Sequence, residues 1–417
     1  MRVLIVSCVF PPEPVVSSQT TAQITRKLVE RGHQVTVITS FPSRPGGKLY
    51  PAYQRKFLER KPSPEGYLLV RCFSFLSGES HMLSRFLENI SFGISAGWAL
   101  LTEPRPDVVY SIVWPLFAEG IVLLVARLRG IPIVLSKQDM YPESLAVQGR
   151  VRPDQWLYKL FLWLDRWIAR KASALIVISE SFAKNYVQIR GIEQSKITII
   201  PNWIDSKSVT VQDKNDYRQE KGISNDAFVI LYGGNVGVAA GVEMVIEALG
   251  RVRTSREIVL IVAGSGSQLS ACQELAAQVS NVRVVFHTPW ATEETSKTLA
   301  AADVLILPTR GKQSLASVPS KLLSYLLAAR PVLAMVLPES DTARMVEEAA
   351  CGWVVMPDDG AALTQKIEEL TVVPEEVLVE MGVAGRAYAL QHFTDNTCLP
   401  IAVQVIEKAA KEEHGRD

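Results

Sequence analysis

Apolar runs alternate with amphipathic stretches along most of this chain. In the first half, six apolar runs bounded by turn residues predict buried strands: Val3–Ser7, Gln34–Thr39, Tyr67–Phe73, Asp107–Val113, Pro132–Ser136 and Ala174–Ile178. Six more follow in the second half: Phe228–Tyr232, Ile258–Ala263, Val282–Phe286, Val304–Leu307, Pro331–Met335 and Trp353–Met356. Helical periodicity fills the intervals, for example at Thr20–Arg31. This alternation predicts the α/β class, with parallel sheets covered by helices on both faces.

The length of the chain, 417 residues, favours two domains over one core. A polar segment separates the two series of strands, and we interpret residues 206–226 as an interdomain linker. The expected domains are therefore 1–205 and 227–395, each a Rossmann-like doubly wound sheet, facing each other across a cleft. The last helical segment, 396–417, could cross back to the first domain.

Composition excludes several classes of protein. A net charge of +1 gives no electrostatic case for nucleic acid. Five cysteines without CxxC spacing are typical of a reducing compartment and indicate no zinc site. The first ten residues predict a strand and not a signal peptide, and no apolar stretch is clean enough to span a bilayer. We expect a cytoplasmic protein, at most peripheral to a membrane.

The segment Leu307–Val336 carries the first candidate site. It predicts a buried strand ending at Pro308, a polar loop, and a helix that opens at Pro319 and Ser320. The N–H groups and dipole at such a helix start favour an anion, typically phosphate. Nearby cations are Arg310, Lys312 and Lys321. An ordinary helix start with solvated cations is the alternative, but its place late in a doubly wound half favours nucleotide binding.

Two glycine-rich loops follow strands of the second half. Gly234, Asn235 and Gly237 lie in the first loop, and Gly264 lies in the second. Glycine permits close approach of the backbone to phosphate. For Gly264, a plain strand-to-helix turn explains the residue equally well.

Two carboxylates, Asp139 and Glu143, follow the fifth strand of the first half. Ligands of open parallel sheets bind at this end of the strands. Either residue could orient an acceptor hydroxyl or take its proton, which makes both candidate catalytic residues. The alternative is a loop that is stabilised by turns and helix caps.

The order of short motifs resembles the family 4 glycosyltransferases over nearly the whole chain. The motifs that carry this resemblance are the opening MRVLIVSCVFPPEPVVSS, then LIVISE, IIPNWID, YGGNVG, VAGSG, AADVLILP and VPSKLLSYLLAARPV. SKQDMYPES, PNW and PSKL together are similar to the subgroup that adds N-acetylated deoxyhexoses such as N-acetylfucosamine. The resemblance implies two Rossmann-like domains (GT-B), a retaining reaction and no obligatory metal. It also implies a nucleotide-sugar donor and an acceptor-binding first domain.

The resemblance places the acceptor loop at FPPEPVVSS, with Glu13, Val16 and Ser17 on the acceptor side and Ser17–Ser18 capping the next helix. It implies that the donor lies against the two glycine-rich loops and the Pro319–Ser324 helix start, with Ser324 near the ribose. Relatives carry two glutamates where this chain has Ala316 and Ser324, and cations in the first glycine-rich loop where this chain has none. A serine accepts fewer ribose hydrogen bonds than a carboxylate does. The sequence has no DxD-type metal site, and we interpret Asp358-Asp359 as a turn or cap.

Two segments could contact a membrane. Helix 155–172 places Trp156, Leu160, Trp163 and Trp167 at helical spacing, and we favour a core helix over a membrane-interface helix. Residues 48–101 join a basic run to an aromatic, apolar stretch, and in the family this region helps to dock on lipid-linked acceptors.

The sequence as a whole predicts a retaining, metal-independent glycosyltransferase without a cofactor. Its expected partners are a UDP-linked sugar and a saccharide or polyprenyl-linked acceptor, with peripheral membrane contact at the inner face of the plasma membrane and no nucleic acid. The alternatives are a homologue that binds nucleotide without turnover, and a GT-B sugar-nucleotide epimerase.

Overall fold

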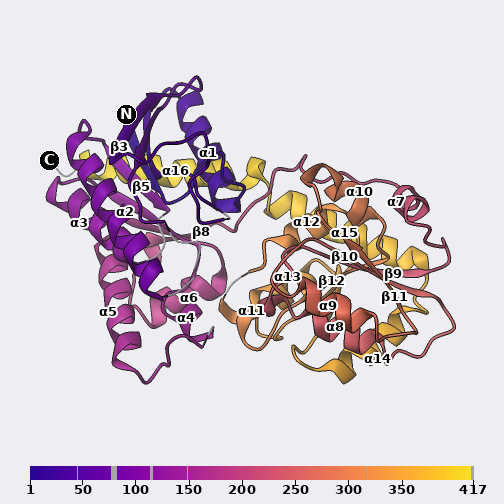
Figure 1. The fold of residues 1–417 in the computed structure, drawn as a ribbon. Coiled ribbons are helices and arrows are strands. Elements are labelled where there is room, and N and C mark those ends of the chain that lie inside the picture. Colours follow the sequence, from indigo (N-terminus) through magenta and orange to yellow (C-terminus); the bar gives the residue numbers. More distant parts are fainter. Residues whose placement is uncertain (45, 77–81, 113–115, 148, 317, 415–417) are drawn as a thin grey trace. The chain divides into compact units, whose positions relative to one another are not determined.

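The computed structural model describes all residues except 45, 77–81, 113–115, 148, 317 and 415–417. The chain divides into two compact units (Figure 1). The first comprises Met1–Asn202 and Asp395–Asp417, and the second comprises Trp203–Thr394.

Within the described residues, the first unit is an eight-stranded sheet in the order β3-β4-β2-β1-β5-β6-β7-β8. Its strands are β1 (Arg2–Ser7), β2 (Gln34–Ser40), β3 (Leu58–Pro62), β4 (Leu68–Cys72), β5 (Val108–Ile112), β6 (Ile133–Lys137), β7 (Ala174–Val177) and β8 (Ile197–Ile199). Its helices are α1 (Val16–Glu30), α2 (Met82–Thr102), α3 (Leu116–Leu128), α4 (Glu143–Val147), α5 (Trp156–Lys171), α6 (Glu180–Gln188), the short η1 (Gln194–Lys196) and α16 (Asp395–His414).

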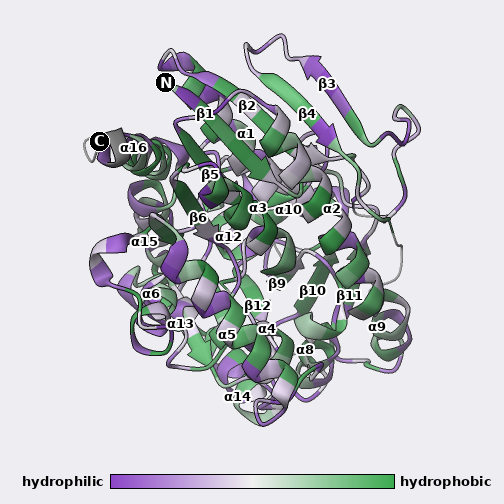
Figure 2. Cartoon of the chain, turned by 90° about the vertical axis from the view of Figure 1, so that its left-hand side faces the viewer, coloured by the Kyte–Doolittle hydropathy of each residue, from purple (hydrophilic) through white to green (hydrophobic). Residues whose placement is uncertain are grey.

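Seven of these strands pair in parallel, and β3 alone among the described strands of this sheet is antiparallel, beside β4. β3 is polar and largely exposed, as its hydrophilic colour in Figure 2 shows. The central strands are hydrophobic and buried. Helices α2, α3 and α5 pack side by side, while α16 contacts α1 and strands β5 to β7. The C-terminal helix is therefore part of the first unit.

The described part of the second unit is a six-stranded parallel sheet in the order β11-β10-β9-β12-β13-β14. Its strands are β9 (Phe228–Gly233), β10 (Ile258–Ala263), β11 (Arg283–His287), β12 (Val304–Pro308), β13 (Val332–Met335) and β14 (Gly352–Val355). Its helices are α7 (Lys214–Glu220), α8 (Val242–Leu249), α9 (Leu269–Ala276), α10 (Thr295–Ala300), α11 (Gln313–Ala316), α12 (Lys321–Leu327), α13 (Asp341–Glu348), α14 (Gly360–Leu370) and α15 (Glu375–His392), with the short η2 (Val238–Ala240) and η3 (Thr292–Glu294).

Alternate residues of these strands enter two separate cores. Val229 and Leu231 of β9 lie in one core, whereas Phe228 and Ile230 lie in the other. Because both faces of the sheet are buried, the strands are continuous apolar runs, and this pattern made them predictable from the sequence.

The twelve expected strands are present, with ends that shift by at most one residue; the expected end of the fourth, Val113, lies outside the described residues. The sequence missed β3 and β8. The expected linker, 206–226, belongs to the second unit: it contains α7, and its Tyr217 and Arg218 are buried. Arg218 forms an ion pair with Asp303 at 2.9 Å, so a residue that looks solvated in the sequence serves as an anchor.

Candidate active site

In the second unit, the two glycine-rich loops pack backbone against backbone. A Cβ atom on Gly264 would lie 2.0 Å from the Gly234 carbonyl oxygen, and Gly264 has a φ of +133°. The Gly234 amide donates to the Ala263 carbonyl at 2.9 Å, and the Val236 amide donates to the Ser265 carbonyl at 2.9 Å. Packing between the two loops is therefore sufficient to require glycine at position 264.

Lys321, the first residue of α12, lies against the first of these loops. Its Nζ donates to the Tyr232 hydroxyl at 2.7 Å and lies 4.2 Å from the centre of the Tyr232 ring. A Cβ atom on Gly234 would come within 3.2 Å of Nζ. Burial lowers the pKa of Lys321 to about 8, and no described carboxylate lies within ion-pair distance of Nζ. The ammonium is therefore a partly buried positive charge without a counterion among the described residues.

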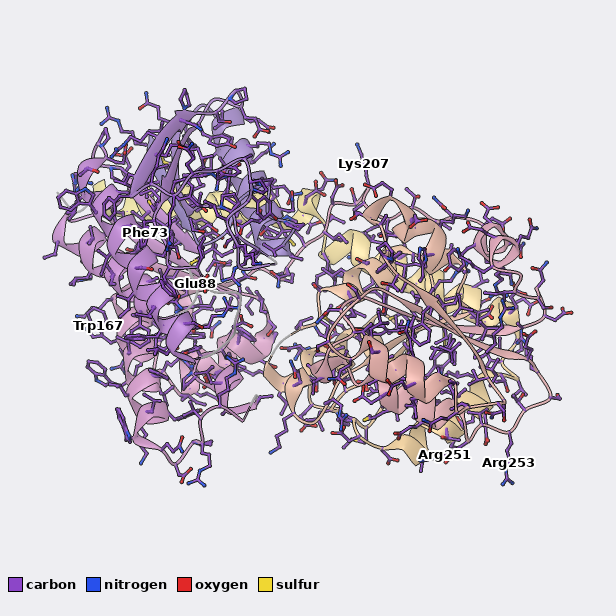
Figure 3. All side chains as sticks on the ribbon, in the orientation of Figure 1. Phe73, Glu88, Trp167, Lys207, Arg251 and Arg253 are labelled. Atoms are coloured by element: carbon purple, nitrogen blue, oxygen red, sulfur yellow. The ribbon has the colours of Figure 1, made fainter. Side chains whose placement is uncertain are left out.

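The other predicted cations differ from Lys321. Arg310 forms ion pairs with Glu243 at 2.6 Å and Asp358 at 2.9 Å, so two carboxylates already compensate its charge. Lys312 is exposed. Among basic residues elsewhere on this unit, Lys207, Arg251 and Arg253 extend into solvent (Figure 3).

The start of α12 differs slightly from the expectation. Pro319 lies outside the helix and its carbonyl accepts from the Leu322 amide at 3.1 Å, while Ser320 is the N-cap residue without a side-chain capping bond. Ser324 is partly buried on this helix. Tyr325 of the same helix is bound to both backbone groups of Gly233, accepting at 2.8 Å and donating at 3.1 Å. These two hydrogen bonds fix α12 against the end of β9. The side chain of Ala316, the other position where relatives carry a glutamate, lies outside the described part of the chain.

Asn235 and Gly237 occupy the loop between β9 and η2. The Asn235 carbonyl accepts from the Tyr232 hydroxyl at 2.6 Å. Gly237 has a φ of −113°, which any residue can adopt, but a Cβ atom there would lie 3.0 Å from the Asn235 side-chain amide. Glycine is therefore favoured at position 237 because a larger residue would crowd the Asn235 side-chain amide, and not because the backbone is strained.

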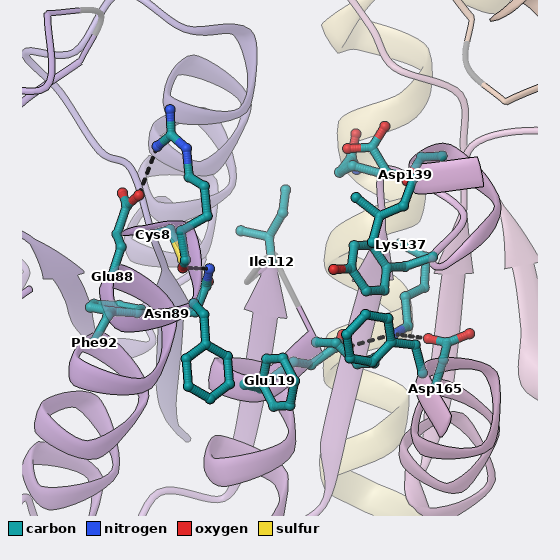
Figure 4. Close-up of a pocket in the computed structure, with 18 of the residues that line it drawn as sticks. Cys8, Glu88, Asn89, Phe92, Ile112, Glu119, Lys137, Asp139 and Asp165 are labelled. Atoms are coloured by element: carbon teal, nitrogen blue, oxygen red, sulfur yellow. Dashed lines mark hydrogen bonds and ion pairs between the residues drawn. The ribbon is translucent and has the colours of Figure 1, made fainter. Parts of the chain in front are cut away.

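The first unit contains a cavity of about 770 Å³, within the usual size range of ligand pockets. Figure 4 shows Glu88, Asn89 and Phe92 of α2 on one wall and Asp139, which follows β6, on the other. An aromatic chain lines it: Phe86 contacts Phe117, Phe117 contacts Phe161, and Phe161 contacts Tyr141, with ring centroids 5.0, 5.8 and 5.6 Å apart. Three arginines also line the cavity: Arg44 and Arg85 both pair with Glu88 at 2.7 Å, whereas Arg150 forms no ion pair with a described residue. The cavity suits a largely apolar ligand with an anionic group near Arg150.

The two candidate catalytic carboxylates have different surroundings. Asp139 lines the cavity and is accessible to solvent, yet the surrounding protein partly desolvates it and raises its pKa. It forms no ion pair with a described residue. Glu143, the first residue of α4, binds Arg190 through hydrogen bonds of 3.0 and 2.8 Å and is not among the residues that line the cavity. The geometry favours Asp139 as the reactive group and Glu143 as part of the loop's support.

A buried ionic cluster lines the inner end of the cavity and was not predicted from the sequence. Lys137 Nζ lies 2.5 Å from Glu119 and 3.0 Å from Asp165, and all three residues line the cavity (Figure 4). Burial opposes the charge on Lys137, but the two carboxylates outweigh it and raise its pKa. Asp165 also binds the buried Arg190. The available signal was a single acid inside each of two helices, Glu119 in α3 and Asp165 in α5, whose other charged residues are all basic.

The three acceptor-side residues do not line this cavity. Glu13 is buried, and its carboxylate accepts from the amides of Ser43 and Arg44 at 3.0 and 2.9 Å, which ties two loops together. Val16 is exposed at the start of α1, and Ser17 lies in the first turn. The expectation that Ser17–Ser18 cap the helix is wrong: Val15 is the N-cap residue, and no side chain caps the helix.

The α5 helix exposes two of its three tryptophans, Trp156 and Trp163, whereas Trp167 is partly buried and packs against the core, so the core-helix interpretation holds for only one face of the helix. Trp156, Leu160 and Trp163 are 74, 42 and 60% exposed, while Phe161, Asp165, Ile168 and Ala169 face the core. Along α2, Leu83, Leu87, Ile94, Trp98 and Leu101 are also exposed. Figure 2 shows hydrophobic colour along much of α2 and mixed colours along α5. In the described part of the chain, no helix has the length and hydropathy needed to cross a bilayer.

The described residues contain no cluster of three or more His, Cys, Asp or Glu with metal-binding geometry. Asp359 caps α14 by accepting from the Ala362 amide at 2.8 Å, as the turn-or-cap interpretation predicted. Asp358 accepts from the Gly311 amide at 2.7 Å and binds Arg310.

Both units resemble known glycosyltransferases. Residues 17–203 match the family described as glycosyl transferase 4-like domain, and residues 227–371 match glycosyl transferases group 1. WcaI of Escherichia coli (strain K12), described as a putative colanic acid biosynthesis glycosyl transferase, is 25% identical over 403 residues, 93% of this chain and 96% of WcaI. The probable glycosyltransferase WbjE of Pseudomonas aeruginosa is 26% identical over 334 residues, 78% of this chain and 80% of WbjE.

Solved structures share the fold. WaaG, a glycosyltransferase involved in lipopolysaccharide biosynthesis, superposes with a TM-score of 0.68 at 18% identity, covering 97% of this chain and 99% of WaaG. HepE of Anabaena, solved in complex with UDP, has a TM-score of 0.68 at 14% identity, covering 98% of this chain and 100% of HepE. The two α/β units are thus those of a GT-B glycosyltransferase. The chain belongs to the family 4 glycosyltransferases and is a transferase enzyme.

Proposed function

We propose that this enzyme is a retaining, metal-independent glycosyltransferase. It transfers a sugar from a UDP-linked donor to a lipid-linked saccharide or another surface-glycan precursor. The observation that carries the proposal is the Lys321 ammonium, which is partly buried beside Gly234 and has no carboxylate partner among the described residues. A diphosphate supplies the missing negative charge.

The chemistry of glycosyl transfer requires such a group. The nucleoside diphosphate departs while positive charge develops on the sugar, so cations and N–H dipoles at the leaving phosphates lower the barrier. Lys321 fits this role better than Arg310, whose charge two carboxylates already compensate. HepE, which has the same fold, is solved with UDP, and this supports a uridine nucleotide as the donor carrier.

The cavity of the first unit supports an amphiphilic acceptor. Its aromatic wall suits a lipid chain or the apolar faces of sugars, and Arg150, which forms no ion pair with a described residue, suits a phosphate group. In this proposal Asp139 faces the acceptor and takes or orients the proton of its hydroxyl.

The exposed apolar residues of α2 and α5 support contact with the cytoplasmic face of a membrane. Trp156 and Trp163 share one side of α5, and the exposed Lys159, Arg170 and Lys171 lie on the same helix. Tryptophan together with basic residues is typical of helices that lie in a membrane interface. An enzyme docked in this way meets a lipid-linked acceptor where the lipid resides.

Calorimetric titration tests the donor site. UDP, GDP, ADP and dTDP are titrated into the wild type, and we expect UDP to bind best. Lys321→Ala should weaken UDP binding by about 1–3 kcal/mol, because a charge-assisted hydrogen bond is lost. Lys207→Ala, at an exposed lysine of the same unit, should leave the affinity unchanged. Unchanged UDP affinity in Lys321→Ala would remove Lys321 from the site.

A further inference from the structure

Tyr232 is bound on both sides by groups of the candidate donor site. Its side chain is fully buried at the end of β9. The hydroxyl donates to the Asn235 carbonyl at 2.6 Å and accepts from Lys321 Nζ at 2.7 Å. One phenol thus connects the glycine-rich loop to the first residue of α12.

The surroundings of Lys321 explain why such a partner is needed. The titratable group that faces Nζ from β9 is Tyr232, while Tyr325 lies on the lysine's own helix and is bound to Gly233. No described carboxylate is within ion-pair distance. A flexible lysine side chain has considerable rotamer entropy. The Tyr232 hydroxyl and ring restrict that freedom while leaving the charge uncompensated.

We propose that Tyr232 is a positioning residue that holds the Lys321 ammonium beside Gly234, directed at the diphosphate of the nucleotide donor. This inference rests on the proposed function, because it assumes that Lys321 binds the diphosphate. Because Tyr232 is fully buried, it acts through the lysine and not through a contact of its own with the donor. A hydroxyl accepts a hydrogen bond without adding negative charge, so Tyr232 orients the lysine and does not compete with phosphate as a carboxylate would.

Three variants test this role: Tyr232→Phe, Lys321→Met and the double substitution. UDP and uridine are titrated into each, since uridine lacks the diphosphate. Tyr232→Phe should weaken UDP binding by about 10- to 150-fold, the loss expected for one hydrogen bond to a charged group. Uridine affinity should stay unchanged. The double variant should bind UDP no more weakly than Lys321→Met, because Tyr232 acts through the lysine.

The pH dependence adds a measurement that a purely structural role would not change. Since the pKa of Lys321 is lowered to about 8 in the free protein, UDP affinity should decline as the pH rises through that value. Lys321→Met should lack this decline. Tyr232→Phe should shift it to lower pH, because the ammonium loses an acceptor that favours its charged form. In the wild type at pH 8.5, calorimetry in buffers of different ionisation enthalpy should show proton uptake with UDP binding.

Several results would overturn the inference. If Tyr232→Phe binds UDP normally while Lys321→Met does not, Tyr232 has no positioning role and the proposed donor site stands. Equal losses for UDP and uridine in Tyr232→Phe would assign the residue to loop structure. If Lys321→Met binds UDP normally, the donor site and this inference fall together. Should Tyr232→Phe not fold, normal UDP binding by Lys321→Met would still overturn the inference, because Tyr232 is proposed to act only through that lysine.

Discussion

The guanidinium of Arg190 holds the carboxylate of Glu143 through two hydrogen bonds, 3.0 Å from Nη1 to Oε1 and 2.8 Å from Nη2 to Oε2. Arg190 is fully buried and also binds Asp165 of α5. Four residues earlier, Asp139 has no such partner among the described residues and faces the cavity. Two carboxylates that look equivalent in the sequence therefore have different surroundings.

Asp139→Asn should lower sugar transfer at least about tenfold while leaving UDP affinity unchanged, since proton transfer by a side chain typically contributes more than that. Because the surrounding protein partly desolvates Asp139 and raises its pKa, its carboxylate is protonated at a higher pH than that of a fully solvated aspartate. Wild-type turnover should therefore fall on acidification before exposed aspartates titrate. Steady-state rates and UDP titrations measure both effects.

Glu143→Gln is the matched control for Asp139→Asn. It should mainly lower stability, by about 1–3 kcal/mol, because Arg190 loses a charged partner. Thermal unfolding measures this loss. Wild-type transfer rates in Asp139→Asn would assign Asp139 to loop structure.

Gly264→Ala should destabilise the protein by roughly 3 kcal/mol or more. The new Cβ atom would lie 2.0 Å from the Gly234 carbonyl oxygen, at a φ of +133°. Gly222→Ala is the control, since Gly222 has a φ of +60° with no atom within 4 Å of the added Cβ, and it should cost only about 1 kcal/mol. Chemical denaturation compares the two. If Gly264→Ala is as stable as the control but loses UDP affinity, then Gly264 contacts phosphate instead.

Ser324→Glu should tighten UDP binding by about 1–2 kcal/mol, because a carboxylate accepts both ribose hydroxyls in charge-assisted hydrogen bonds. Ser324 is partly buried on α12, three residues after Lys321. Titration of UDP into the wild type and into Ser324→Glu measures the change in affinity. A loss of affinity would mean that the glutamate clashes or stays unpaired, and that the site takes a different donor.

The double substitution Trp156→Ser/Trp163→Ser should weaken binding to anionic phospholipid vesicles about tenfold or more, because two interfacial side chains are lost. Vesicle co-sedimentation measures it. Val379→Ser/Val383→Ser on α15, at residues 45 and 58% exposed, serves as the control and should bind vesicles like the wild type. Equal binding by both variants would contradict a role for this face of α5.

The sequence predicted the two α/β sheets because their strands are buried on both faces and form continuous apolar runs. It missed β3, whose residues Leu58–Pro62 are largely polar and pair at a sheet edge. It also assigned Trp156 and Trp163 of α5 to the core, although both are exposed. Asp165 faces inward because Lys137 and Arg190, distant in the sequence, supply its partners. The hydrophobic periodicity of a helix cannot predict ion-pair partners that lie far away in the sequence.

The candidate site was predictable only in part. The glycine-rich loops and Lys321 came from motifs that lie close together in the sequence. The cavity brings residues of α2, α3 and α5 together from segments that are distant in the chain, so no local pattern indicates it. Tyr232 was read as an ordinary strand residue, because its role depends on the position of Lys321, 89 residues away.

The transfer reaction itself tests the account most directly. The purified enzyme is incubated with a UDP-linked sugar of α configuration, a synthetic polyprenyl-diphosphate saccharide and EDTA, and the product's anomeric configuration is determined by NMR. We expect an α-linked product, formed as fast with EDTA as without it. UDP binding with no transfer would identify a homologue without turnover. A β-linked product, or transfer that EDTA abolishes and a divalent metal restores, would contradict the retaining, metal-independent mechanism.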